Sequence, residues 1–215
     1  QLVHGHPIAG GGLFPGQLGY DFVNQTGEPR WPNSARWMSS VGIDLVTINP
    51  WAYALLGQKG PDPASPPEGY AVERVFPDGS AVWRVTAPPA DAVPVFRQGG
   101  GGSSETPPDP SIRRWMLDGG RITVVAPSPG DYRLRFHAWG RDGLSHRLAI
   151  TLPDGSVRRV EVSDGTTVDL PMRLEDTQGD IVIRNEGPAA RQIAPGDPRV
   201  VSVQMDEPEI TRVGP

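Results

Sequence analysis

Residues 113–138, RRWMLDGGRITVVAPSPGDYRLRFHA, contain the pattern that decides the fold of this chain. A β-branched run at 122–125 is followed by a Pro-Ser-Pro-Gly turn at 127–130. Residues 132–138 then alternate strictly between apolar and polar side chains, so one face of this strand meets a core and the other meets water. A short strand, a tight turn and an alternating strand predict the start of an antiparallel sandwich or barrel.

The remainder of the C-terminal half repeats this pattern of short strands and tight turns. Further strands are predicted at 146–152, 157–162, 167–170, 181–185 and 199–205. Asp-Gly, Pro-Asp-Gly and Gly-Asp sequences separate many of them, and such sequences favour hairpin turns. Short strands at near-regular spacing predict a β-sandwich, most simply a jelly roll.

The N-terminal half has a different pattern. After an irregular arm rich in Gly and Pro, a short helix is predicted at 34–40, with Ser34 as its N-cap. A buried strand at 43–49, a second short helix at 50–56 and a hairpin over 70–85 follow. This order predicts a small α+β domain. Four tryptophans are assigned to its core: Trp31, Trp37, Trp51 and Trp83.

The two halves meet in a segment without regular periodicity. Residues 86–112 show no pattern, and residues 98–111 are rich in Gly, Ser and Pro, which is typical of a linker or surface loop. We therefore divide the chain into an α+β domain at 1–97, a linker at 98–111 and a sandwich at 112–215. The predicted fold class is mainly β: a jelly-roll-like antiparallel β-sandwich preceded by a small α+β domain.

Composition excludes several classes of function. The 215 residues carry a formal net charge of −5 and no basic run longer than an arginine pair, so no nucleic-acid partner is expected. Cysteine is absent, which excludes disulfides, zinc-thiolate sites and cysteine nucleophiles. No apolar run reaches the roughly 18 residues of a membrane helix. The chain begins at Gln1 without a signal peptide, and we expect it to be a piece of a longer protein.

The order of several short motifs resembles that of the C-terminal extracytoplasmic region of bacterial polytopic membrane glycosyltransferases of the GT-C type. The motifs are HGHP at 4–7 with FP at 14–15, VGIDLV at 41–46, AY at 52–53, FPDGSAVWRV at 76–85 and RWM at 114–116. Together they extend over most of the chain. In that family the catalytic acids lie in loops between membrane helices, and this chain has no such helices.

The resemblance implies an accessory, non-catalytic domain at the extracytoplasmic face of the bacterial cell membrane. Its expected partners are the membrane-embedded part of the parent chain and a cell-envelope glycan. Two alternatives remain open: a secreted glycoside hydrolase or esterase, and a purely structural interaction module. Fold class alone does not separate these three hypotheses.

Two tryptophans of the C-terminal half have planar polar neighbours, as carbohydrate-binding surfaces do. A sugar ring stacks its apolar face on an indole while planar polar groups bind the hydroxyls. The predicted carbohydrate-binding residues are Arg113, Arg114, Trp115, His137, Trp139, Arg141 and Asp142. The alternative is that both tryptophans cap the core, with arginines stacked on them.

Catalytic acids and metal ligands are poorly supported by the sequence. A glycosidase needs two carboxyl groups held about 5 to 10 Å apart, whereas the available acids lie in predicted loops or at the tail. These acids are Glu175, Asp176, Asp206, Glu207 and Glu209. We predict no catalytic residue.

Two groups of residues have side chains suited to a metal site. His4 and His6 have a spacing that suits a metal, but no further ligands accompany them. Asp142, Asp154 and Asp180 offer a structural calcium site, although Asp-Gly and Gly-Asp turns explain these residues more simply. We predict no metal ligand and no cofactor, with structural calcium as the alternative.

Overall fold

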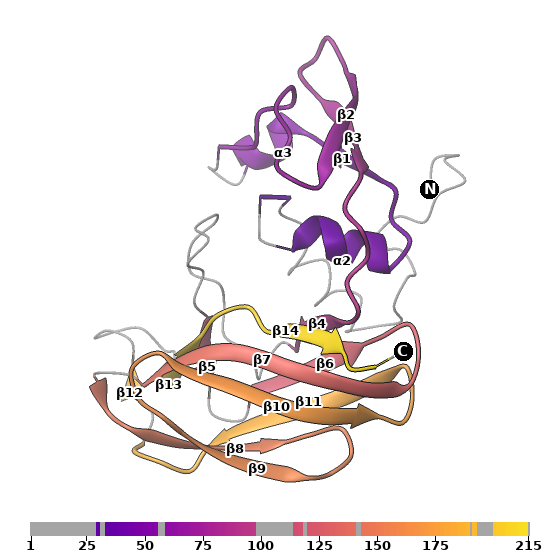
Figure 1. Cartoon of the computed structure of the whole chain (residues 1–215). Coiled ribbons are helices and arrows are strands. Elements are labelled where there is room, and N and C mark those ends of the chain that lie inside the picture. Colours follow the sequence, from indigo (N-terminus) through magenta and orange to yellow (C-terminus); the bar gives the residue numbers. More distant parts are fainter. Residues whose placement is uncertain are drawn as a thin grey trace. The chain divides into compact units, whose positions relative to one another are not determined.

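The computed structural model describes residues 29–30, 33–55, 59–97, 114–117, 120–140, 143–189, 191–192 and 200–214. The chain divides into two compact units, residues 1–90 and 91–215 (Figure 1). Within the described ranges, no helix is both long and apolar enough to cross a lipid bilayer.

The first unit combines two short helices with one small sheet. Its elements, in chain order, are α2 (Ser34–Ser40), β1 (Leu45–Ile48), α3 (Pro50–Leu55), β2 (Tyr70–Val75) and β3 (Ala81–Val85). The three strands are antiparallel and lie in the order β1-β3-β2. The predicted sequence of helix, strand, helix and hairpin is therefore confirmed.

Trp83 is the centre of the core of the first unit. Its side chain is fully buried, its indole nitrogen donates to the Pro63 carbonyl at 2.8 Å, and its ring lies 5.9 Å from that of Tyr70. Trp37 is also buried, as predicted. Trp51 is 63% exposed, so its assignment to the core was wrong. The helix α3 has less than two turns and packs Tyr53 against the core instead. Trp31 lies outside the described residues.

The predicted N-cap of α2 was also wrong. The cap position is occupied by Asn33, in the left-handed conformation with φ of 62° and without a side-chain capping bond. Ser34 is buried inside the first turn, where its hydroxyl lies 2.9 Å from the Tyr70 hydroxyl. A serine at the start of a helix favours a capping hydrogen bond to a nearby backbone N–H. Here the hydroxyl of Ser34 contacts Tyr70 instead.

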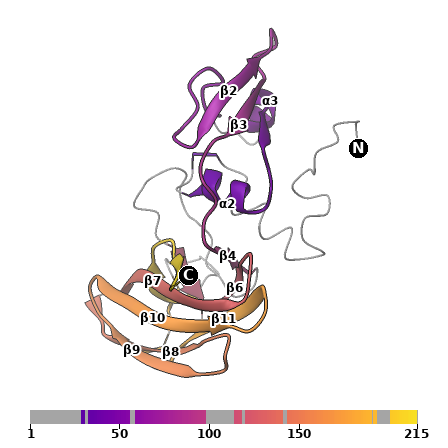
Figure 2. The same cartoon turned by 45° about the vertical axis from the view of Figure 1, so that its right-hand side comes forward.

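The second unit is a sandwich of two antiparallel sheets, whose layers are visible in Figures 1 and 2. The six-stranded sheet has the order β10 (Thr166–Leu174), β7 (Gly130–Gly140), β13 (Val200–Met205) and β12 (Arg191–Gln192). Two further strands extend it: β14 (Glu209–Arg212) pairs with β7, and β5 (Arg114–Leu117) pairs with β13. The five-stranded sheet has the order β4 (Val93–Phe96), β6 (Gly120–Val125), β11 (Gln178–Asn185), β8 (His146–Thr151) and β9 (Val157–Val162). The predicted mainly β sandwich is confirmed.

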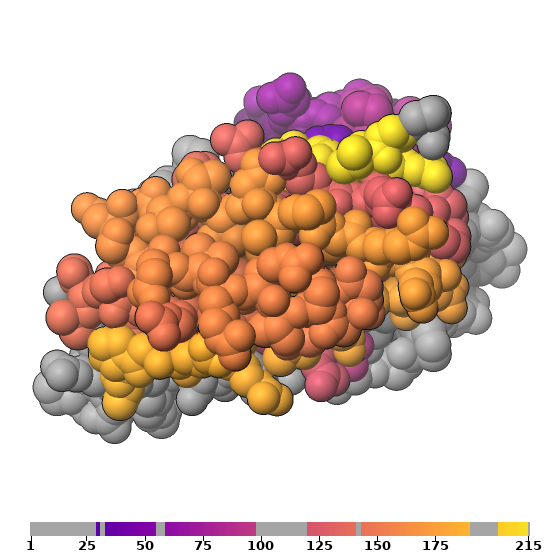
Figure 3. Space-filling model, turned by 60° about the horizontal axis from the view of Figure 1, so that its bottom comes forward, coloured from indigo at the N-terminus to yellow at the C-terminus, as the bar shows by residue number. Residues whose placement is uncertain are grey.

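The core lies between the two sheets and follows the predicted alternation. On β7, Tyr132, Leu134, Phe136 and Ala138 are each at most 2% exposed and pack in one cluster with residues of the opposite sheet. The intervening residues of β7 point to the outside, as a period of two requires. The surface seen from below in Figure 3 is formed mainly by orange segments that include β9 and β10, the end strands of the two sheets.

Two strands of the sandwich differ from the prediction. Residues 86–112 show no periodicity in the sequence, yet β4 pairs with β6 and is buried along its whole length. Burial on both faces removes the alternation by which strands are recognised. Contacts divide the chain between Ala90 and Asp91, so β4, placed before the linker by sequence, belongs to the sandwich. The supposed tail also contains β14, and the predicted linker at 98–111 lies outside the described residues.

Candidate functional site

Two of the predicted carbohydrate-binding residues lie side by side on the outer face of the six-stranded sheet. Ala138 on β7 is fully buried, so its neighbours His137 and Trp139 point away from the core. Their ring centroids are 6.2 Å apart and the ring planes are inclined by 36°. Both side chains are half-buried, which leaves part of each ring accessible.

Asp206, directly after β13, holds the imidazole of His137 in place. One carboxylate oxygen accepts the backbone N–H of His137 at 2.7 Å, and the other lies 2.8 Å from the ring Nδ1. In return, the backbone N–H of Asp206 donates to the His137 carbonyl at 3.1 Å. Three hydrogen bonds between the same two residues fix both the strand ends and the ring.

This arrangement determines which groups the site offers to a ligand. An ionised carboxylate only accepts hydrogen bonds, so the Nδ1 of His137 is the donor to Asp206. In the neutral imidazole, Nε2 is then an acceptor. The side chain of His137 is 43% exposed and that of Asp206 is 32% exposed, so solvent reaches both partners.

The register of the sheet places a third polar group and a second tryptophan in the same row. Gln204 on β13 is the Cα partner of Trp139 on one side and of Trp115 in β5 on the other. The turn between β9 and β10 lies against the indole of Trp139: a Cβ at Gly165 would lie 3.4 Å from its Nε1. The row and the turn together enclose Trp139 on two sides.

The remaining predicted binding residues are only partly described. Arg114 and Trp115 belong to β5, whose backbone alone is described. Arg113, Arg141 and Asp142 lie outside the described residues. The structure therefore brings His137 and Trp139 together and places Trp115 in register with them.

Sequence reasoning missed three residues of this surface. Asp206 was interpreted as a solvated acid at the tail, and Gln204 and Thr167 were not singled out. Thr167 is exposed and is the Cα partner of His137 on β10. The alternation of residues 199–205 was the available signal for Gln204, whereas no local pattern indicates that Asp206 pairs with a residue 69 positions away.

Ion pairs cover the adjoining part of the same outer face. Two nitrogens of the Arg133 guanidinium donate to the carboxylate of Asp169 on β10, one of them to Oδ2 at 3.0 Å. These hydrogen bonds lower the pKa of Asp169 below its ordinary value. Farther along, Arg173 donates to Asp131 at 3.2 Å. These two pairs neutralise four charged side chains of the face, and the aromatic pair beside them is its distinctive feature.

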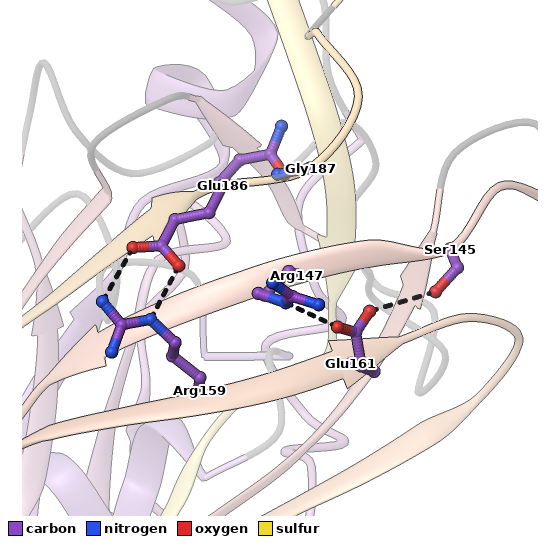
Figure 4. Close-up of polar contacts among 7 residues, drawn as sticks. Ser145, Arg147, Arg159, Glu161, Glu186 and Gly187 are labelled. Carbon is purple, nitrogen blue, oxygen red and sulfur yellow. Dashed lines mark hydrogen bonds and ion pairs between the residues drawn. The ribbon is translucent and has the colours of Figure 1, made fainter.

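The outer face of the five-stranded sheet is neutralised in the same way (Figure 4). Arg159 donates to both carboxylate oxygens of Glu186, at 2.9 and 3.3 Å, and lowers the pKa of that carboxyl. Arg147 donates to Glu161 at 2.6 Å, and Ser145 donates to the same carboxylate. This face has no described aromatic pair beside its polar groups.

No arrangement of acids in the described residues supports glycoside hydrolysis. A general acid at neutral pH requires a raised pKa, whereas hydrogen bonds lower the pKa of Asp78, Asp154, Asp169 and Glu186. Glu175 and Asp176 are exposed in the turn after β10. Asp206 is engaged with His137.

The described acids of the proposed calcium site serve other contacts. Asp154 accepts the backbone N–H of Ser156 at 2.8 Å, as expected for a turn, and Asp180 accepts the hydroxyl of Thr123 at 2.7 Å. Asp142, His4 and His6 lie outside the described residues. Within the described residues, no group of three or more His, Asp or Glu side chains is arranged to hold a metal.

We compared the chain with protein families, with curated protein sequences and with solved structures. No family model and no curated protein sequence matches this chain. Among solved structures, a CBM35 module from Cellvibrio japonicus Abf62 shares 11% identity over 57% of this chain and 98% of its own, with a TM-score of 0.34. TmCBM61, in complex with β-1,4-galactotriose, shares 16% over 57% and 88%, with a TM-score of 0.28.

An isomalto-dextranase of Arthrobacter globiformis T6, complexed with panose, is also similar. It shares 19% identity over 63% of this chain, with a TM-score of 0.38. The present chain spans about a quarter (26%) of the length of that enzyme. At these levels of identity, the likenesses concern the β-sandwich and assign no family.

Proposed function

We propose that the sandwich is a carbohydrate-binding module whose site is the outer face of the six-stranded sheet around Trp139. The observation that carries this proposal is the pairing of the Trp139 and His137 rings on one face, with His137 fixed by Asp206. A pyranose ring stacks its C–H face on the indole. The Nε2 of His137 and the amide of Gln204 bind its hydroxyl groups.

The chemistry of this surface favours a neutral glycan. Several of its acidic and basic side chains are already paired with one another, as in Arg133 with Asp169 and His137 with Asp206. A charged ligand would have to compete with these pairs, whereas hydroxyl groups need only the donors and acceptors that remain. Stacking on one partly exposed indole gives modest affinity, because little of the ligand is desolvated.

Titration of the full chain with a panel of cell-envelope glycans tests the proposal. Isothermal titration calorimetry should detect binding of at least one neutral glycan, and Trp139→Ala should abolish it. Trp51→Ala is the matched control, since it removes a 63% exposed indole from the other unit and should leave binding unchanged. Equal loss in both variants, or no binding by the unmodified chain, would contradict the assignment.

We further propose that the chain is an accessory, extracytoplasmic part of a bacterial GT-C glycosyltransferase, which it helps to engage cell-envelope glycan. The support is the motif order from HGHP at 4–7 to RWM at 114–116. In this setting the membrane-embedded part of the parent chain is its partner and carries the catalysis. The parent gene should then encode many apolar segments of about 20 residues upstream of this region. A parent without such segments would contradict this context, although the module could still bind glycan.

A further inference from the structure

The outer face of β7 continues beyond the aromatic pair towards the start of the strand. Trp139 is the last outward residue before β7 ends at Gly140, and the turn that contains Gly165 lies against its indole. In the opposite direction, His137 and then Arg135 follow at every second position, each about 7 Å farther along the same face. A ligand longer than one sugar ring can therefore extend from Trp139 over His137 to Arg135.

The guanidinium of Arg135 has no partner in the described part of the chain. The side chain is exposed. Asp169, its Cα partner on β10, accepts hydrogen bonds from Arg133 instead. Glu209, its Cα partner on β14, forms no ion pair with it within the described residues. The N–H donors of Arg135 are therefore available to a ligand.

Arg135 and His137 offer complementary groups along this face. The Nε2 of a neutral His137 accepts a hydrogen bond from a hydroxyl group, whereas a guanidinium donates several hydrogen bonds in one plane. Neighbouring hydroxyl oxygens of a pyranose lie side by side and can accept two donors of such a planar fork. Because the spacing of about 7 Å between the two residues is comparable to the length of one pyranose unit, Arg135 is placed for the sugar that follows the one on Trp139.

We infer that the glycan site extends along β7 and binds a linear oligosaccharide, with one sugar residue on Trp139 and His137 and the next on Arg135. This inference rests on the proposed function of the Trp139 surface. It adds the class of ligand, which is a sugar chain and not a single terminal sugar. Arg135 contacts the second sugar position only, so its contribution depends on the length of the ligand.

Calorimetric titration of the full chain with neutral oligosaccharides of increasing length tests this inference. The probes are glucose and its β-1,4-linked and α-1,4-linked oligomers up to the tetrasaccharide. In at least one series, the affinity should rise about tenfold between glucose and the trisaccharide, as expected for hydrogen bonds to a charged group.

The same titration distinguishes failure of the inference from failure of the glycan site. A rise no larger than the number of sugar residues would reflect only the several equivalent positions of a longer chain. That result would overturn the inference and leave glycan binding at Trp139 intact. If no member of either series bound to the unmodified chain, both the glycan site and its extension would be contradicted.

Substitutions of Arg135 test which residue binds the second sugar. Arg135→Gln should remove most of the gain with chain length and leave the affinity for glucose unchanged. Arg135→Lys keeps the charge without the planar fork and should have an intermediate effect. The control Arg184→Gln changes an exposed arginine of β11, in the other sheet, and should bind every probe like the unmodified chain. If the gain persists in Arg135→Gln, the assignment of the second position to Arg135 is wrong.

NMR titration shows which part of the strand each ligand covers. Glucose should shift the resonances of the His137 ring and of the Trp139 indole N–H, whereas the trisaccharide should also shift the Nε–H of Arg135. Trp139→Ala should abolish both sets of shifts, because the first sugar position anchors the chain. Shifts of Arg135 that are as large with glucose as with the trisaccharide would place all three contacts on one sugar and overturn the inference.

Discussion

The carboxylate of Asp206 accepts both the backbone N–H and the ring Nδ1 of His137, at 2.7 and 2.8 Å, although 69 residues separate the two along the chain. The backbone bond joins the end of β13 to β7, and the ring bond orients the imidazole beside Trp139. One carboxylate therefore links the pairing of two strands to the geometry of the proposed glycan site.

This link predicts that Asp206→Asn weakens glycan binding with little effect on the fold. In the asparagine, an NH2 donor replaces one of the two carboxylate oxygens, so only one of the two positions that face His137 still accepts, and the ring loses its fixed orientation or its tautomer. We expect a loss of about fivefold in affinity, corresponding to about 1 kcal/mol for one hydrogen bond. Calorimetry measures the affinity, and ¹⁵N NMR of the His137 ring reports the tautomer.

Glu209→Gln serves as the control for this change, because it removes one exposed carboxylate from the neighbouring strand β14. It should alter neither the His137 tautomer nor glycan affinity. If both variants weaken binding equally, the general loss of negative charge explains the effect and the contact with His137 does not.

The turn beside Trp139 gives a second prediction. Gly165 has φ of +69°, and a Cβ there would lie 3.4 Å from the indole nitrogen. Gly165→Ala should strain the turn by about 1 kcal/mol and place a methyl group in contact with the edge of the Trp139 indole, so that glycan affinity falls. Gly155→Ala is matched in conformation, with φ of +78°, but has open space around the added Cβ.

Denaturant unfolding and calorimetric titration of the two glycine variants separate these effects. Both should lose similar stability, whereas only Gly165→Ala should lose affinity and shift the tryptophan fluorescence. Equal glycan affinities would show that the turn at Gly165 does not support the binding surface.

Local sequence patterns predicted the strand faces and the hairpin turns. They did not predict contacts between residues that are distant in the sequence. The alternation of residues 132–138 was sufficient to place His137 on the face opposite the core, and the Pro-Asp-Gly sequences identified hairpins. The partnership of His137 with Asp206 requires the register between β7 and β13, which no local pattern contains. Ser34, a good cap by local preference, is instead taken into the core by Tyr70.

The pairing of Arg133 with Asp169 predicts a specific dependence on pH. The hydrogen bonds from Arg133 lower the pKa of Asp169 in the folded chain, so the unfolded chain binds the proton more readily. The stability that this pair contributes is therefore fully present above the unfolded pKa of about 3.9 and is lost as pH falls through the lower folded value. An NMR titration of the Asp169 carboxyl measures the shift directly.

Arg133→Gln should move this titration midpoint back towards about 3.9. Arg135→Gln, two residues along the same outward face, should move it less, because Arg135 acts on Asp169 only through a weaker charge interaction. A midpoint that is unchanged in Arg133→Gln would assign the lowered pKa to some other group.

Two buried residues of β7 allow the contributions of packing and of hydrogen bonding to the stability of the sandwich to be measured separately. Tyr132 and Leu134 are both fully buried, but only Tyr132 has a polar contact, in which its hydroxyl donates to the Ser128 carbonyl at 2.7 Å. Tyr132→Phe keeps the ring and should lower the free energy of unfolding by about 1 kcal/mol. Leu134→Ala leaves a cavity and should lower it by about 2 to 5 kcal/mol. Urea unfolding followed by circular dichroism measures the free energy of unfolding of both variants. If Tyr132→Phe lost as much stability as Leu134→Ala, the turn at 127–130 would depend on the tyrosine hydroxyl for its structure.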